Sequence, residues 1–161
     1  MSVSSIPAGY HSVTPYLIIK GAARALEWYQ KAFGAKEKMR LAGPDGSIGH
    51  AEMVIGDSHV MMADEHSQMQ AFGPEHYQGS PVSLLLYVDD VDETFQQAVD
   101  AGAEALRPVQ DQFYGDRMGT LKDPFGHTWS IGTHIEDVSQ EEVERRMAAM
   151  GAGLEEKSNG A

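Results

Sequence analysis

The sequence predicts an α+β protein made of two tandem βαβββ modules and a C-terminal helix. Two observations predict this fold: a pattern of strand, helix and glycine stop occurs twice, and turn residues divide each half into short strands. Residues 15–19 precede an amphipathic stretch that ends at Gly34, and residues 84–88 precede one that ends at Gly102. The offset between the copies is about 69 residues, so we expect two related half-domains in one body.

The first module spans residues 12–63. Residues 12–20 are apolar and β-branched, which favours a strand, and the helical period begins after Gly21. Gly34 stands in the position expected just past a helix C-terminus. Three strands are expected at 37–41, 48–55 and 59–63, because Pro, Gly and Asp turn residues separate them. The predicted buried stripe of the helix is Ala22, Ala25, Leu26, Tyr29 and Phe33.

The second module spans residues 82–133 and repeats this order. Residues 82–88 predict its first strand, and Asp90 is a helix N-cap candidate with Glu93 three residues later. The remaining strands are expected at 105–109, 117–121 and 128–132. Residues 64–81 have no hydrophobic period and form a linker of a length typical of functional lids or disordered connectors. Residues 12–133 are therefore expected to form a single domain.

The chain after residue 133 predicts one more helix and a tail. Ser139 and Glu142 form an S-x-x-E capping box, which indicates a helix over residues 139–150. Residues 151–161 contain little that could be buried, so we expect them to be disordered.

Composition narrows the class of partner. The formal net charge is -12, which disfavours contact with nucleic acid or an anionic membrane surface. There is no cysteine, which excludes disulfides and thiolate chemistry, and no apolar run approaches the roughly 18 residues of a membrane span. A cytoplasmic protein is the expectation.

Several motifs carry a family resemblance. They are Trp28-Tyr29, Phe33-Gly34-Ala35, Val88-Asp89-Asp90-Val91, Tyr114-Gly115-Asp116-Arg117 and the segment from Asp123 to Trp129. Together with the two modules, these motifs resemble the vicinal-oxygen-chelate superfamily of glyoxalase, bleomycin-resistance and extradiol dioxygenase proteins, and within it the PhnB-like branch. The resemblance implies a cupped, eight-stranded mixed sheet with the helices outside. It also implies a divalent metal held by His, Glu or Gln on the first and last strands of each module.

The residues at these metal positions argue against the usual ion. The positions fall on or near Thr14, Met62, Ser83 and Ser130, and none of these is a normal ligand for zinc, iron or manganese. We therefore expect no metal and no other cofactor. Asp64, two residues from Met62, is the nearest side chain that could restore one ligand.

Candidate catalytic residues are His50 and Glu52, which alternate with apolar residues on the predicted strand 48–55. On the cup side they would act as a general base or a substrate clamp; on a solvated strand face they would have no role. Arg117 suits a carboxylate or phosphate, or else a local ion pair in its turn. Tyr16 and Tyr87 either contact a planar ligand or simply fill the barrel. The full candidate ligand-binding set is Tyr16, Met62, Asp64, Tyr87, Tyr114, Arg117 and Ser130.

The resemblance and the missing ligands favour a glyoxalase/bleomycin-resistance-like protein that binds a small organic molecule without the family's metal. The alternative is a metal-dependent lyase or dioxygenase of the same superfamily with displaced ligands, or a metal-free isomerase that uses His50 and Glu52. A third possibility is an assembly subunit whose C-terminal helix packs on a partner. Family members commonly pair, so a homodimer is expected; whether the chain is an enzyme stays open.

Overall fold

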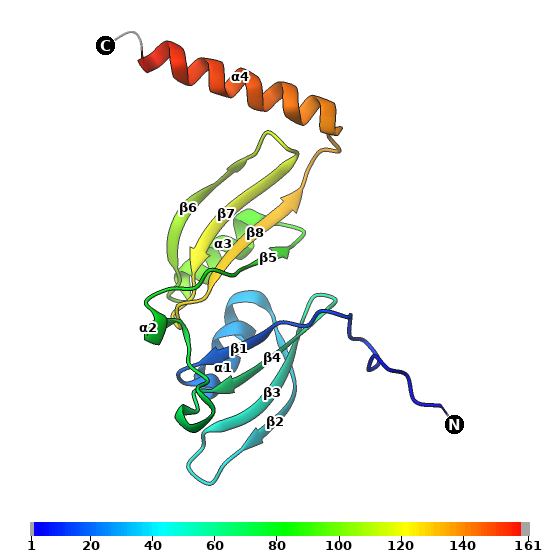
Figure 1. Ribbon diagram of the computed structural model, residues 1–161, viewed down its shortest axis with the longest axis vertical. Helices are drawn as coiled ribbons and strands as arrows, with labels where there is room; N and C mark the ends of the chain where they lie inside the picture. Colours follow the sequence, from blue (N-terminus) through cyan, green and yellow to red (C-terminus); the bar gives the residue numbers. More distant parts are fainter. Residues whose placement is uncertain (1, 159–161) are drawn as a thin grey trace.

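The computed structural model describes residues 2–158, and their side chains up to Gly151. Figure 1 shows the two modules following one another along the long axis of the molecule. In the first module the elements are β1 (Tyr16–Ile19), α1 (Ala22–Phe33), β2 (Lys36–Ala42), β3 (Ile48–Ile55) and β4 (Ser58–Asp64). A linker with a 3-10 turn, η1 (Ser67–Met69), and a short helix, α2 (Pro74–Tyr77), leads to β5 (Ser83–Tyr87), α3 (Val91–Asp100), β6 (Glu104–Asp111), β7 (Asp116–Lys122), β8 (Thr128–His134) and α4 (Gln140–Ser158).

The predicted fold class is confirmed, with the eight strands divided between two sheets. The first sheet has the order β1-β4-β3-β2 and the second the order β5-β8-β7-β6. In each sheet the first strand pairs in parallel with the last, and the other pairs are antiparallel. Each sheet is thus one βαβββ module, and both are mixed as expected.

Helix α1 forms where the apolar period predicts it. Ala22, Ala25, Leu26 and Tyr29 are buried, and Gly34 ends the helix in the left-handed region with φ 67°. Its N-cap residue, Gly21, has no side chain that could cap the helix. The orphan N–H groups of Gly21 and Ala22 are instead bound by Asp64 Oδ1 from the end of β4, at 2.9 and 3.0 Å. Helix α3 is capped locally, because Asp90 accepts a bond from the N–H of Glu93 as predicted.

The core of the molecule lies where the two modules meet. Tyr29 of the first module reaches the buried carboxylate of Asp123, which is 2% exposed, in the β7–β8 turn of the second. The Tyr29 hydroxyl and Trp129 Nε1 both donate to Asp123 Oδ2, at 2.5 and 2.9 Å, while Oδ1 accepts from the N–H groups of Phe125 and His127. One carboxylate therefore shapes its own turn and joins the modules.

Two segments differ from the sequence prediction. The linker 64–81 contains η1, α2 and an isolated bridge between His66 and Ala71, so it has local structure of its own. The C-terminal helix continues to Ser158, eight residues past the predicted end, and residues 151–158 are helical rather than disordered. Helix formation is cooperative, so a helix begun by strong caps extends through a poor sequence. Residues 159–161 of the predicted tail lie outside the described residues.

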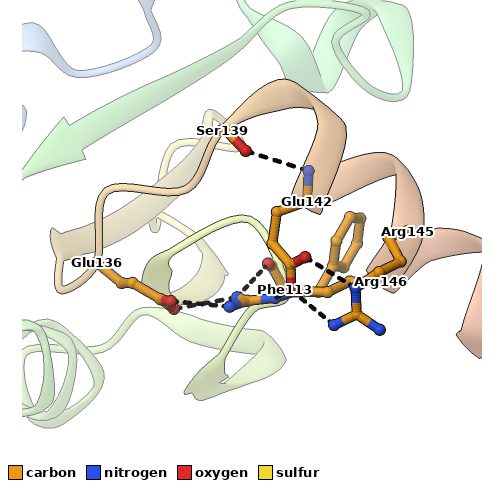
Figure 2. Close-up of polar contacts among 6 residues, drawn as sticks. All are labelled: Phe113, Glu136, Ser139, Glu142, Arg145 and Arg146. Carbon is orange, nitrogen blue, oxygen red and sulfur yellow. Dashed lines mark hydrogen bonds and ion pairs between the residues drawn. The ribbon is translucent and has the colours of Figure 1, made fainter.

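Helix α4 is fixed to the body by charged side chains at its base, shown in Figure 2. Ser139 Oγ accepts the N–H of Glu142, as the capping box predicts. Arg146 donates to Glu136, to Glu142 and to the backbone oxygen of Phe113, at distances of 2.8 to 3.0 Å. These bonds set the direction in which α4 leaves the second module (Figure 1).

The first prediction concerns the junction. Asp123→Ala removes the acceptor for two side chains and two backbone N–H groups, and leaves them buried without partners. We expect a loss of about 3 to 5 kcal/mol of unfolding free energy, measured by urea denaturation. The matched control is Asp57→Ala in an exposed turn, where the loss should stay below about 0.5 kcal/mol. Equal losses for the two variants would contradict the role of Asp123.

Candidate functional site

Polar side chains gather on the face of the first sheet that points away from α1, which we call the first open face. On β3, Ala51, Met53 and Ile55 are buried toward the helix, and His50 and Glu52 between them point to the opposite side. The register pairs Glu52 with Met61 and Met61 with Tyr16, so these three residues form one row across the sheet. The structure therefore brings His50, Glu52 and Tyr16 together.

A continuous hydrogen-bonded chain runs through this face. The Tyr16 hydroxyl lies 2.9 Å from His50 Nδ1, and His50 Nε2 lies 3.1 Å from Glu52 Oε1. An ionised carboxylate only accepts, so in the neutral imidazole form His50 donates through Nε2 and accepts at Nδ1. The Tyr16 hydroxyl then donates to Nδ1. Glu52 thus sets the tautomer of His50, and His50 orients the hydroxyl of Tyr16.

Glu52 is held ionised by its neighbours. Its pKa is lowered, first by the hydrogen bond from the Tyr10 hydroxyl, then by the bond from His50, with burial opposing and the Lys38 ammonium 3.9 Å away adding to the effect. Tyr16, at the outer end of the hydrogen-bonded series Tyr16–His50–Glu52, is accessible, because it is 48% exposed. Burial of its hydroxyl nevertheless raises the pKa of Tyr16, which favours a neutral donor over a phenolate.

Tyr10 completes the cluster, and the sequence analysis did not identify it. It lies before the predicted domain boundary at residue 12, and its ring stacks on His59 with 4.1 Å between centroids. Lys38 Nζ lies 4.7 Å from the centre of the same ring. Burial and the bond to Glu52 raise the pKa of Tyr10 to about 12. Gly9 is the sequence signal: its φ is 83°, and a Cβ there would lie 2.8 Å from the His59 ring.

The second sheet carries a separate cluster on its corresponding face, the second open face. The Tyr87 hydroxyl donates to Asp116 Oδ2 at 2.7 Å, and His134 Nδ1 lies 2.7 Å from Asp116 Oδ1. Burial opposes ionisation of Asp116, but the bonds from His134 and Tyr87 outweigh it and lower its pKa. His134 also contacts Asp137, and the two carboxylates raise the pKa of His134. Ser130 lies on this face too, 3.1 Å from the Thr120 hydroxyl.

The remaining predicted ligand-binding residues lie elsewhere. Met62 is fully buried because it faces α1, one residue out of phase with Met61. Asp64 is occupied by the N–H groups at the start of α1 and by the N–H of Ile48. Both residues therefore have packing or capping roles, and the expectation that they line a common cup with Tyr16 is corrected.

Arg117 and Tyr114 also lie apart from the first open face. Arg117 forms a two-bond pair with Asp92 at the start of α3 and a further bond with Asp111, so the local ion-pair alternative describes its position. The Tyr114 hydroxyl lies 3.6 Å from the sulfur of Met118. Both residues belong to the second module.

The residues at the family's metal positions do not fit a divalent ion. Met62 is enclosed in the core, the Ser130 hydroxyl is paired with Thr120, and Thr14 Oγ1 lies near the backbone oxygen of His11. Among residues 2–151, whose side chains the structure describes, no three His, Asp or Glu side chains are grouped as a metal site requires. No helix in this part of the chain is long and apolar enough to cross a membrane.

Comparisons with known proteins agree with the two-module architecture. The model of the Glyoxalase/Bleomycin resistance protein/Dioxygenase superfamily matches residues 10–131. An uncharacterized protein of Mycobacterium bovis is 39% identical over 156 residues, 95% of this chain and 100% of that protein. TioX from Micromonospora sp. ML1 is similar in structure, with a TM-score of 0.60 and 25% identity over 80% of this chain and 100% of TioX. A PhnB protein from Bacillus cereus shares the fold, with a TM-score of 0.59 and 18% identity over 76% of this chain and 99% of that one.

The second prediction concerns the titration of Glu52. Tyr10→Phe removes the largest cause of its lowered pKa, so the pKa should rise toward the ordinary carboxyl value in a carboxyl-detected NMR titration. Because the folded pKa lies below the unfolded one, Glu52 adds stability above the unfolded pKa and loses it as pH falls through the folded pKa. In Tyr10→Phe this acid-side loss should shrink. Tyr114→Phe, a matched change in the second module, should leave the titration of Glu52 as it is in the unmodified protein; a Glu52 pKa unaffected by Tyr10→Phe would refute the contact.

Proposed function

Because this chain belongs to the Glyoxalase/Bleomycin resistance protein/Dioxygenase superfamily, we propose that it binds a small organic molecule on its first open face. The observation that carries the proposal is the hydrogen-bonded series Tyr16–His50–Glu52, which ends at the hydroxyl of the half-exposed Tyr16. A half-buried charge that orients an accessible polar group is typical of binding sites, which hold few but well-placed polar groups. The Tyr114–Arg117 motif and the fold shared with a PhnB protein support the PhnB-like branch.

The charges favour a ligand with a cationic or hydrogen-bond-donating group. The Tyr16 oxygen donates its proton to His50, so toward a ligand it acts as an acceptor. The ionised Glu52 lies behind it, and the net charge of -12 adds a long-range attraction for cations. The apolar side chain of Met61, beside Tyr16 in this row, suits the body of such a molecule. Binding needs no metal in this arrangement.

A second candidate is proton-transfer catalysis at the same residues. The arrangement of hydroxyl, imidazole and carboxylate favours it, because the carboxylate holds His50 in the tautomer that accepts a proton at Nδ1. The raised pKa of Tyr16 keeps its hydroxyl protonated, so in such a step it takes part as a hydrogen-bonding hydroxyl and not as a phenolate base. Turnover of a bound ligand, measured by NMR on the recovered molecule, separates this candidate from binding alone.

We further propose a homodimer, in which a second copy covers the open faces. Leu85 and Tyr87 are 48% and 57% exposed, and Leu41 on β2 is 57% exposed. Faces with this much apolar surface are typical of interaction sites. A dimer would close both faces into cups, as the family resemblance implies. A cytoplasmic location belongs to the same proposal and rests on the absence of cysteine.

The third prediction compares two probes that differ in charge, 2-phenylethylamine and 2-phenylethanol. The amine should bind about tenfold more tightly, because a charged hydrogen bond near Glu52 contributes more than a neutral one. Glu52→Gln should remove this preference, and added salt should weaken it. Glu27→Gln removes an equal charge from the exposed side of α1 and should preserve it. Ligand-observed NMR titrations measure the ratio, and an amine preference that survives Glu52→Gln would defeat the site assignment.

The fourth prediction concerns the dimer. Sedimentation equilibrium should report twice the chain mass of 17.5 kDa. Leu85→Glu places a charge on the second open face and should shift the protein toward monomer. Met69→Glu is the matched control, because Met69 is 75% exposed in η1 of the linker and belongs to neither sheet. A monomeric parent protein, or equal dissociation by the two variants, would rule the arrangement out.

A further inference from the structure

A broad cleft lies where the two modules and the linker meet, beside α2 (Figure 1). Its volume is about 930 Å³, which is large enough for a small organic molecule. Its walls are the start of α1, the short helix α2, and the α3–β6 and β7–β8 turns. The β7–β8 turn comes so close to α2 that a Cβ on Gly126 would lie 2.9 Å from Pro74. None of the lining residues belongs to the polar clusters around Glu52 and Asp116, so the cleft is separate from the site proposed above.

Two lysines line the cleft, and each forms an exposed ion pair. Lys20 Nζ lies 3.8 Å from Glu75 Oε2 of α2. Lys122 Nζ lies 3.0 Å from Glu104 Oε2 at the start of β6. All four side chains are at least 44% exposed. Ion pairs as exposed as these stabilise a protein little, so either ammonium group can turn toward a ligand at low cost.

Arg24 adds a third cation to the lining, and among residues 2–151 it forms no ion pair with a carboxylate. Its guanidinium carbon lies 5.6 Å from the centre of the Phe125 ring. Asp123 also lines the cleft, but it is buried and already accepts four hydrogen bonds. Asp64, at the start of α1, is likewise satisfied by three N–H groups. The accessible charged groups of the lining are therefore three cations and two carboxylates, an excess of one positive charge.

We infer that this cleft binds a small organic monoanion, with its carboxylate on Arg24 and its apolar body against Phe125, Pro74 and Pro124. A guanidinium presents two parallel N–H groups that match the two oxygens of a carboxylate. The ring and the two prolines give the cleft an apolar surface beside this charge. At about 0.1 M salt, charges beyond roughly 10 Å are screened, so the local excess outweighs the net charge of -12.

Two probes of nearly the same shape test the inference, phenylacetate and the uncharged phenylacetamide. Phenylacetate should bind about tenfold more tightly to the full chain, because its bond to Arg24 is charge-assisted. Arg24→Gln removes the guanidinium, so the affinity ratio should fall to about one. Arg107→Gln is the matched control, because Arg107 is an exposed arginine on β6 outside the cleft. That variant loses the same charge and should keep the ratio near ten.

A charge added to the opposite wall provides a second, independent check. Gln78 lines the cleft and is exposed, so Gln78→Glu changes the charge with little change of shape. It should weaken binding of phenylacetate and leave that of phenylacetamide unchanged. In a ¹⁵N NMR titration, phenylacetate should shift the Nε–H resonance of Arg24.

Equal affinities for the two probes in the unmodified protein, no binding of either, or a ratio that survives Arg24→Gln would each overturn the inference. Shifts confined to Tyr16 and His50 would overturn it too, because they would assign phenylacetate to the first open face. The open face has its own probe, 2-phenylethylamine, so failure of the cleft and failure of the proposed function are seen separately.

Discussion

The buried carboxylate of Asp123 is the interaction on which the rest of the structure depends. It accepts bonds from the β7–β8 turn, from Trp129 and from Tyr29 of the other module, and burial together with Asp123 raises the pKa of Tyr29 well above its ordinary value. A buried carboxylate is tolerated only when its oxygens are satisfied, and these four donors meet that condition. Since Tyr29 belongs to α1, the bond sets how the first module sits on the second, and this packing buries the aromatic helix face against Trp129 and Phe125.

This packing determines which surfaces remain for function. With α1, α3 and the buried faces of both sheets in the core, the faces that carry Tyr16 and Tyr87 are left toward solvent. Each face then has a polar cluster of the same kind, in which a carboxylate, Glu52 or Asp116, is held ionised by a tyrosine and a histidine.

Charged groups in this chain divide into those that hold the fold and those that face the exterior. Asp64 supplies the cap that Gly21 lacks, and Arg117 joins β7 to α3 through Asp92, so both are satisfied within the fold. Glu52 is also satisfied, but its partners Tyr10 and His50 lie on the open face of the sheet and are only half-buried. The same reasoning applies to Arg146, whose bonds to Glu136 and Glu142 determine where α4 begins but not what it contacts (Figure 2).

Local patterns in the sequence were sufficient for the repeated βαβββ order, the caps at Gly34, Asp90 and Ser139, and the shared face of His50 and Glu52, because each depends on hydrogen bonds or periods within a few residues. They were not sufficient for Met62, since a one-residue change of phase moves a strand residue to the opposite face. Nor did they reveal Tyr10 over Glu52, the capping role of Asp64 or the division into two sheets. Those features join residues about 40 or more positions apart, and only packing in three dimensions brings such residues into contact.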